Sequence, residues 1–161
     1  MSKKIVVGAD PGSVWLKDSV VKHLQSRGYG ITDLGSTEAR EVPYYEVGYN
    51  CGRAVSHGEF PLGVIFCGSG MGVSLVANKF KGVFAACCES VYSAKLSRAV
   101  NDANILSIGA NFIAPHMAVK MVDAFLDARF LTDFPEGDPD FLAKAVETIR
   151  GYEKELLQSQ T

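Results

Sequence analysis

The stretch Ile65-Phe66-Cys67-Gly68-Ser69-Gly70-Met71-Gly72 places a thiol at the end of an apolar run and follows it with three glycines at alternate positions. Residues 62–66 are short, apolar and partly β-branched, which predicts a buried central strand. Residues 73–79 predict a helix. Cys67 is therefore expected at the carboxyl end of a strand, where the glycines would let backbone N–H groups face an oxygen-rich ligand at the start of the helix. Residues 67–72 are called the Cys67 loop below.

The Cys67 loop has other interpretations when it is taken alone. Cysteine is among the most buried residue types, so Cys67 could be inert packing. Glycine-rich turns between a strand and a helix also bind phosphates and nucleotides, although these residues do not complete a dinucleotide fingerprint. A nucleotide-binding module would further need an acidic residue to hold the ribose, and none stands at the expected spacing after the loop.

The composition of the chain is that of a globular protein. Its 161 residues, of which 47% are hydrophobic and 21% charged, are enough for one well-filled core, so we expect a single domain over residues 1–161. The net charge of −2 gives no general attraction to nucleic acid or to an acidic membrane. No segment has the pattern of a signal peptide or of a membrane span, and we expect a cytoplasmic location.

The cysteines and histidines give no sign of a metal site. The four cysteines form no CxxC pair, and adjacent Cys87 and Cys88 suit a disulfide framework poorly, so we expect free thiols. The histidines, at 23, 57 and 116, lie far from one another and from the cysteines. We therefore expect no metal site.

Strand and helix patterns alternate along the chain. Strands are expected at 4–9, 30–35, 62–66, 83–87 and 105–109, and helices at 15–28, 43–56, 73–79, 90–99 and 115–128. This alternation predicts an α/β fold with a parallel, doubly wound, five-stranded sheet between two helical layers. Residues 133–139 are rich in turn formers, and residues 140–158 predict an extra amphipathic helix at the C-terminus. That helix could lie across a neighbouring subunit or pack on its own domain.

Polar residues adjoin three of the predicted strands. Asp10 follows the first strand, Cys67 follows the central one, and Asn101-Asp102-Ala103-Asn104 precedes the last. The first two share the ligand-binding edge of a parallel sheet, and we expect all three to converge. The Asn-Asp-Ala-Asn run could instead form a cap or a turn.

These motifs together resemble the family of type B ribose-5-phosphate isomerases and galactose-6-phosphate isomerase subunits. The resemblance runs from Ile5 to about Phe130 and rests on an ordered set of motifs: Gly8-Ala9-Asp10, Asp33-Leu34-Gly35, the Cys67 loop, Ala77-Asn78-Lys79 and Asn101-Asp102-Ala103-Asn104. It implies a Rossmann-like homodimer or homotetramer. The implied activity is the interconversion of an aldose and a ketose through a cis-enediolate, without metal or organic cofactor.

The resemblance also implies roles for individual residues. Cys67 would be the base that moves a proton between C1 and C2, with its thiolate stabilised by the loop amides and the following helix. Amides around Gly68, Gly70, Met71 and Gly72 would bind the enediolate oxygen. Ser69, where relatives usually carry threonine, could relay a proton to that oxygen. Asp10 would hold substrate hydroxyls, and Asn101 would donate to a substrate oxygen.

Three departures from the family pattern concern the substrate. Pro11 and Val100 stand where relatives commonly carry histidines, one of which opens the sugar ring. Relatives that bind ribose 5-phosphate grip its phosphate with an Arg-His-rich segment supplied across the dimer, whereas residues 136–140 here are acidic. We therefore expect an isomerase that is not optimised for ribose 5-phosphate, acting on a largely open-chain sugar such as a tetrose derivative.

Other groups could replace the missing histidines. Glu89 is a candidate acid or base, although a solvated glutamate at a helix start is the plainer interpretation. His116 and Arg98 are further candidates, and Arg98 could simply pair on a helix surface. The alternative function is a catalytically weak or half-site subunit of a hetero-oligomeric sugar-phosphate isomerase, with a related chain as its partner. An intact Cys67 loop favours catalysis over that alternative.

Overall fold

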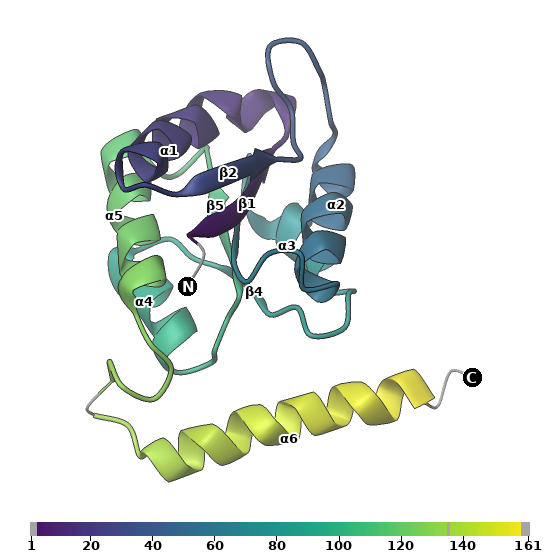
Figure 1. Cartoon of the computed structure of the whole chain (residues 1–161), viewed down its shortest axis with the longest axis vertical. Helices are drawn as coiled ribbons and strands as arrows, with labels where there is room; N and C mark the ends of the chain where they lie inside the picture. Colours follow the sequence, from purple (N-terminus) through teal and green to yellow (C-terminus); the bar gives the residue numbers. More distant parts are fainter. Residues whose placement is uncertain (1–2, 135, 159–161) are drawn as a thin grey trace.

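The computed structural model describes residues 3–134 and 136–158, and the strands in this part of the chain form one parallel sheet (Figure 1). The strands are β1 (Lys4–Ala9), β2 (Gly30–Asp33), β3 (Gly63–Cys67), β4 (Ala85–Cys87) and β5 (Ile105–Gly109). They lie in the order β2-β1-β3-β5-β4, with every neighbouring pair parallel. The α/β fold with a doubly wound, five-stranded parallel sheet is thus confirmed.

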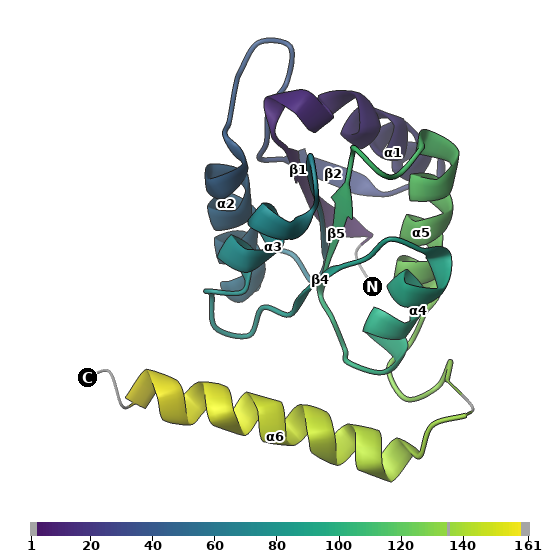
Figure 2. The same cartoon turned by 180° about the vertical axis from the view of Figure 1, so that it is seen from behind.

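Helices cover both faces of the sheet. One face carries α1 (Val14–Ser26), α4 (Val91–Ala99) and α5 (Pro115–Asp127), and the other carries α2 (Tyr44–Ser56) and α3 (Met71–Ala77). Figures 1 and 2 show these two helical layers on opposite sides of the strands. The result is a three-layer sandwich, the arrangement that an alternation of strands and helices favours.

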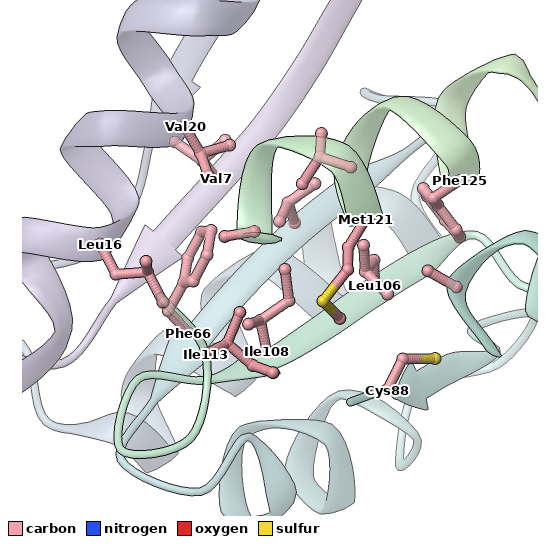
Figure 3. Close-up of a cluster of buried hydrophobic side chains, with 14 of the residues drawn as sticks. Val7, Leu16, Val20, Phe66, Cys88, Leu106, Ile108, Ile113, Met121 and Phe125 are labelled. Atoms are coloured by element: carbon pink, nitrogen blue, oxygen red, sulfur yellow. The ribbon is translucent and has the colours of Figure 1, made fainter. Parts of the chain in front are cut away.

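The larger core lies between the sheet and the layer of α1, α4 and α5. Figure 3 shows Phe66 and Leu106 projecting from the sheet toward Leu16 of α1 and toward Met121 and Phe125 of α5. All five side chains are fully buried. Side chains alternate along a strand, so Ile65 and Cys67, the sequence neighbours of Phe66, belong to the opposite core, which faces α2 and α3. Cys67 is therefore directed toward the α2 and α3 layer.

The chain changes winding direction between β1 and β3. From β1 it proceeds to β2 on one side, and it then crosses back to place β3 on the other side. In open α/β sheets the ligand crevice lies outside the carboxyl ends of the strands at such a switch point. Here those ends are followed by Asp10, beyond β1, and by the Cys67 loop, beyond β3.

Helix α6 (Pro139–Gln158) lies at the opposite end of the sheet, where the strands begin (Figures 1 and 2). Val146 is its buried anchor. Arg150 donates to Asp102 at 2.6 Å, and the carboxylate of Glu153 accepts from the backbone N–H of Gly82 at 2.7 Å. The C-terminal helix thus packs on its own chain, while Phe141, Ile149 and Tyr152 remain exposed.

Some element boundaries differ from those expected from sequence. The helix predicted at 73–79 begins at Met71, because Gly70 adopts φ +75° and turns the chain into the helix two residues earlier. The edge strand predicted at 83–87 is confined to Ala85–Cys87. Within the described residues, no helix combines the length and the apolar composition needed to cross a membrane.

Candidate active site

A cleft of about 410 Å³ opens at the carboxyl edge of the sheet, at the switch point between β1 and β3. Its lining comes from the ends of three strands and the starts of two helices, α2 and α3. The residues are Asp10, Tyr44, Cys67, Gly68, Ser69, Gly72 and Asn111. The predicted convergence of Asp10 with the Cys67 loop is therefore seen in the structure.

Backbone amides of the Cys67 loop turn toward its side chains. The N–H of Gly70 donates to the Cys67 sulfur at 3.2 Å, and the N–H of Met71 donates to the Ser69 hydroxyl at 3.3 Å. Both amides belong to the start of α3, where N–H groups have no partner within the helix. A negative charge on Cys67 would be stabilised by this hydrogen bond and by the positive end of the α3 dipole.

Gly70 packs so tightly that only glycine fits. A Cβ atom on Gly70 would lie 2.9 Å from the backbone nitrogen of Gly109 and 3.0 Å from the sulfur of Cys87. The Ser107 hydroxyl also donates to the Gly70 carbonyl at 2.5 Å. Strands β4 and β5 thus pack against the Cys67 loop at Gly70.

Replacing Gly70 by alanine is expected to lower the free energy of unfolding by about 2 kcal/mol, because a left-handed alanine costs about 1–2 kcal/mol and the new methyl group meets backbone. We expect a loss of at least ~10-fold in kcat, because the amide of residue 70 would move from the Cys67 sulfur. Gly58→Ala is the matched control, with φ +72° and nothing within 4 Å. Denaturant unfolding and turnover measurements on both variants check this, and an equal loss of kcat in both would contradict it.

Asp10 lines the cleft, and one of its carboxylate oxygens has no partner in the described protein. Its backbone is fixed by two hydrogen bonds, from its N–H to the Phe66 carbonyl at 3.3 Å and from the Ser13 N–H to its carbonyl at 3.1 Å. Its Oδ1 atom is buried and has no hydrogen-bond partner in the described protein. A buried acceptor without a partner is costly, so this oxygen is suited to bind a hydroxyl donor from a ligand.

Tyr44 and Asn111 line the cleft but were not among the site residues predicted from the sequence. The backbone N–H of Asn111 donates to the Gly68 carbonyl at 2.9 Å, and its side-chain nitrogen would lie 3.1 Å from a Cβ on Gly68. Position 111 follows β5 at the same edge as Cys67, and this topological signal could have found it. Tyr44 is the first residue of α2, and nothing in the local sequence distinguishes it from a surface aromatic residue.

A buried ion pair supports the segment that leads to Tyr44. Lys17 is only 1% exposed, and its ammonium group contacts Asp33 at 2.5 Å and the Ser36 carbonyl at 2.6 Å. The other oxygen of Asp33 accepts the N–H of Gly35 at 2.9 Å. This network fixes the chain as it leaves β2 and turns toward α2.

Cys87 lies directly behind the Cys67 loop. Its sulfur is 3.7 Å from the Ser69 carbonyl, and burial, followed by the nearby Cys88, Cys67 and Glu89, raises the pKa of the Cys87 thiol. Burial also raises the pKa of Cys88, and that of Cys51 far above its ordinary value. These three thiols therefore stay protonated at neutral pH.

The predicted convergence of Asn101 with Cys67 is wrong within one chain. Gly63 pairs with Ile105, and Cys67 pairs with Gly109, so Asn101 lies beyond the amino end of β5 while Cys67 lies at its carboxyl end. The strand between them is about 13 Å long. In a parallel sheet a residue that precedes its strand lies at the amino edge and one that ends its strand lies at the carboxyl edge, and the expected convergence overlooked this difference.

The other candidates also lie outside the cleft. Glu89 is exposed beyond the end of edge strand β4, next to the capping residue Ser90. His116 is exposed at the start of α5. Arg98 donates to Asp102 and to the Ala103 carbonyl, both at 2.9 Å, so its guanidinium bridges the end of α4 to the following turn. In the described part of the chain, no three histidine, cysteine or acidic side chains group as metal ligands would.

Comparison with known proteins assigns this geometry to a family. The family model described as Ribose/Galactose Isomerase matches residues 5–137, which include every residue that lines the cleft. The chain belongs to this family. It is an aldose–ketose isomerase by membership, and its Cys67 loop and Asp10 lie in the crevice of the shared fold.

Individual members of the Ribose/Galactose Isomerase family match along most of their length. A 4-deoxy-4-sulfo-D-erythrose isomerase from Clostridium sp. (strain MSTE9) is 37% identical, over 95% of this chain and 97% of the relative. A D-erythrulose-4-phosphate isomerase from Pectobacterium atrosepticum is also 37% identical, over 78% of this chain and 84% of the relative. The solved ribose-5-phosphate isomerase B of Clostridium thermocellum superposes with a TM-score of 0.85 at 37% identity, covering 95% of this chain and 99% of the other.

Proposed function

We propose that this isomerase interconverts the aldose and ketose forms of a four-carbon sugar that carries an anionic group at C4. The observation that carries the proposal is the composition of the cleft, in which a thiol with an amide donor and an unpaired carboxylate oxygen lie together without a histidine. The cleft therefore has groups for proton transfer and for hydroxyl binding, but it has no evident acid to open a sugar ring.

The chemistry of the substrate explains why no ring opening is needed. A four-carbon aldose closes a five-membered ring through its C4 oxygen. A phosphate ester on that oxygen, or a sulfonate in its place, removes the ring-closing group, and the sugar stays open. The names of the relatives from Clostridium sp. (strain MSTE9) and Pectobacterium atrosepticum give sugars of these two kinds, which supports the proposal.

Cys67 is the proposed base. Its thiolate takes the proton from C2 of the aldose, the electron pair moves toward the C1 carbonyl oxygen, and a cis-enediolate forms. The proton then returns to C1, while a proton passes from O2 to O1 to give the ketose. Loop amides stabilise the charge on the enediolate oxygens, Ser69 relays the proton between them, and Asp10 binds a hydroxyl farther along the chain.

The anionic end of the substrate requires groups from outside this cleft. The described residues that line the cleft include no lysine, arginine or histidine. We propose that a second copy of the chain supplies them, together with Asn101, from the amino edge of its sheet. The exposed apolar residues of α6, among them Phe141 and Tyr152, would contribute to that contact between subunits.

Proton exchange tests the proposed substrate. The wild-type protein is incubated in deuterated water with D-erythrulose 4-phosphate, 4-deoxy-4-sulfo-D-erythrose or D-ribose 5-phosphate, and isomerisation is followed by NMR. We expect kcat/KM for one of the four-carbon sugars to exceed that for ribose 5-phosphate by at least ~10-fold. An equal or higher value for ribose 5-phosphate would contradict the proposal.

The alternative, a half-site partner subunit, predicts a different result in the same assay. Such a chain would give no exchange with any of the three sugars, and activity would appear only after a related subunit is added. The presence of both Cys67 and the unpaired Asp10 oxygen in one cleft favours an independent enzyme.

A further inference from the structure

Tyr44 is the bulkiest side chain that lines the cleft. The other lining residues are glycines or carry short side chains: Asp10, Cys67, Gly68, Ser69, Gly72 and Asn111. The Tyr44 ring lies directly over Gly72, where an added Cβ would be 2.6 and 2.8 Å from two ring carbons. The wall of the cleft on the α2 side is therefore an aromatic ring in contact with the Cys67 loop.

The backbone before Tyr44 is held in place on both sides. The Ser36 hydroxyl donates to the Val42 carbonyl at 3.0 Å, and the N–H of Val42 donates back to the same hydroxyl at 2.7 Å. The Arg40 guanidinium donates to the Gly35 carbonyl. Gly35 itself touches β1 so closely that a Cβ would lie 2.2 Å from the Ala9 nitrogen. The ring is thus presented from a fixed segment rather than from a loose loop.

A neighbouring ring supports Tyr44 from the side. The Tyr45 ring packs edge-on against it, with the ring centroids 5.4 Å apart. Such edge-to-face pairs are a favourable arrangement for aromatic rings. Movement of Tyr44 away from the cleft would break this contact and the contact with Gly72.

From this geometry we infer that Tyr44 is a specificity-determining residue, whose ring limits the length of the sugar that the cleft accepts. The inference rests on the proposed function, and it adds the group that excludes longer sugars. A pentose differs from a tetrose by one CHOH unit. In a cleft whose other lining side chains are small, the ring is the bulkiest group on the wall and therefore the group best placed to restrict the length of a bound sugar.

The ring, rather than the hydroxyl, is assigned this role. A hydroxyl that bound the substrate would select by a hydrogen bond and would be lost in Tyr44→Phe. A ring that acts as a wall is kept in Tyr44→Phe and lost in Tyr44→Ala. The two variants therefore separate the two roles at one position.

The test measures selectivity, defined as kcat/KM for D-erythrulose 4-phosphate divided by kcat/KM for D-ribose 5-phosphate. Tyr44→Ala is expected to lower this ratio by at least ~10-fold, because misfits of one carbon unit are discriminated by about 10- to 200-fold in enzyme pockets. Tyr44→Phe should stay within about twofold of wild type. Tyr49→Ala is the matched control, because Tyr49 lies on the same helix and is half exposed, but packs on Phe80 away from the cleft.

The outcomes distinguish the inference from the proposed function. A wild-type enzyme that prefers the four-carbon sugar, with a Tyr44→Ala variant that keeps this preference, overturns the inference alone. A wild-type enzyme that prefers ribose 5-phosphate overturns both. An equal fall of the ratio in Tyr44→Phe and Tyr44→Ala would assign selection to the hydroxyl and overturn the role of the ring. Because selectivity is a ratio within one variant, a partial loss of folded protein does not alter it.

Discussion

Replacing Cys67 by alanine is expected to slow proton exchange at C2 of the four-carbon sugar by at least ~100-fold. The sulfur is the only titratable group that the Cys67 loop brings to the cleft, and the Gly70 amide is aimed at it from 3.2 Å. Alanine removes the base but keeps the backbone donors, so substrate binding should change much less than turnover. Initial rates of deuterium incorporation and the KM for the same sugar check both parts.

A second cysteine provides the control for Cys67→Ala. Cys88 is equally buried, at 5% exposure, but it belongs to the core on the opposite face of the sheet. Cys88→Ala should lower stability by about 1 kcal/mol through lost packing and leave the exchange rate unchanged. An exchange rate above a tenth of wild type in Cys67→Ala would remove the thiol from the mechanism.

Replacing Lys17 by methionine is expected to lower the free energy of unfolding by about 3 kcal/mol, which is typical when one partner of a buried pair is removed. Methionine fills similar space but leaves Asp33, which is 26% exposed, without its cation. It also leaves the Ser36 carbonyl without the ammonium group that donates to it. Chemical denaturation monitored by circular dichroism measures the loss.

Two further variants test this interpretation of Lys17. Lys22→Met removes a charge from an exposed position of the same helix and should change stability by less than about 0.5 kcal/mol. Adding Asp33→Asn to Lys17→Met should recover part of the loss, because the unpaired negative charge is then gone. A loss below about 1 kcal/mol in Lys17→Met would show that the pair behaves like a surface ion pair.

The fold and half of the site could be predicted from local sequence patterns. The alternation of apolar strands with amphipathic helices fixes a parallel sheet, and a parallel sheet brings all strand carboxyl ends to one edge. Asp10 follows β1 and Cys67 ends β3. Because these two strands are parallel neighbours at the switch point, both residues lie at the same cleft. Of the loop glycines, only Gly70 approaches the backbone of β5 too closely for a side chain, and the sequence alone did not single it out.

The remaining half depends on relations that local patterns do not contain. Asn101 precedes its strand, which places it at the amino edge of its own sheet, and a contact between this edge and the cleft of a second copy is not written in a local pattern. Tyr44 reaches the cleft through hydrogen bonds of Ser36 and Arg40 that are set only when the segment folds. Contacts between loops and between helix starts could therefore not be predicted from the sequence.

Because Tyr44 and Gly72 are in contact, a substitution at one position affects which residues fit at the other. A side chain at position 72 would require the Tyr44 ring to move, because its first carbon would lie 2.6 Å from a ring carbon. A side chain at position 72 is therefore accommodated more easily after position 44 has lost its ring than before.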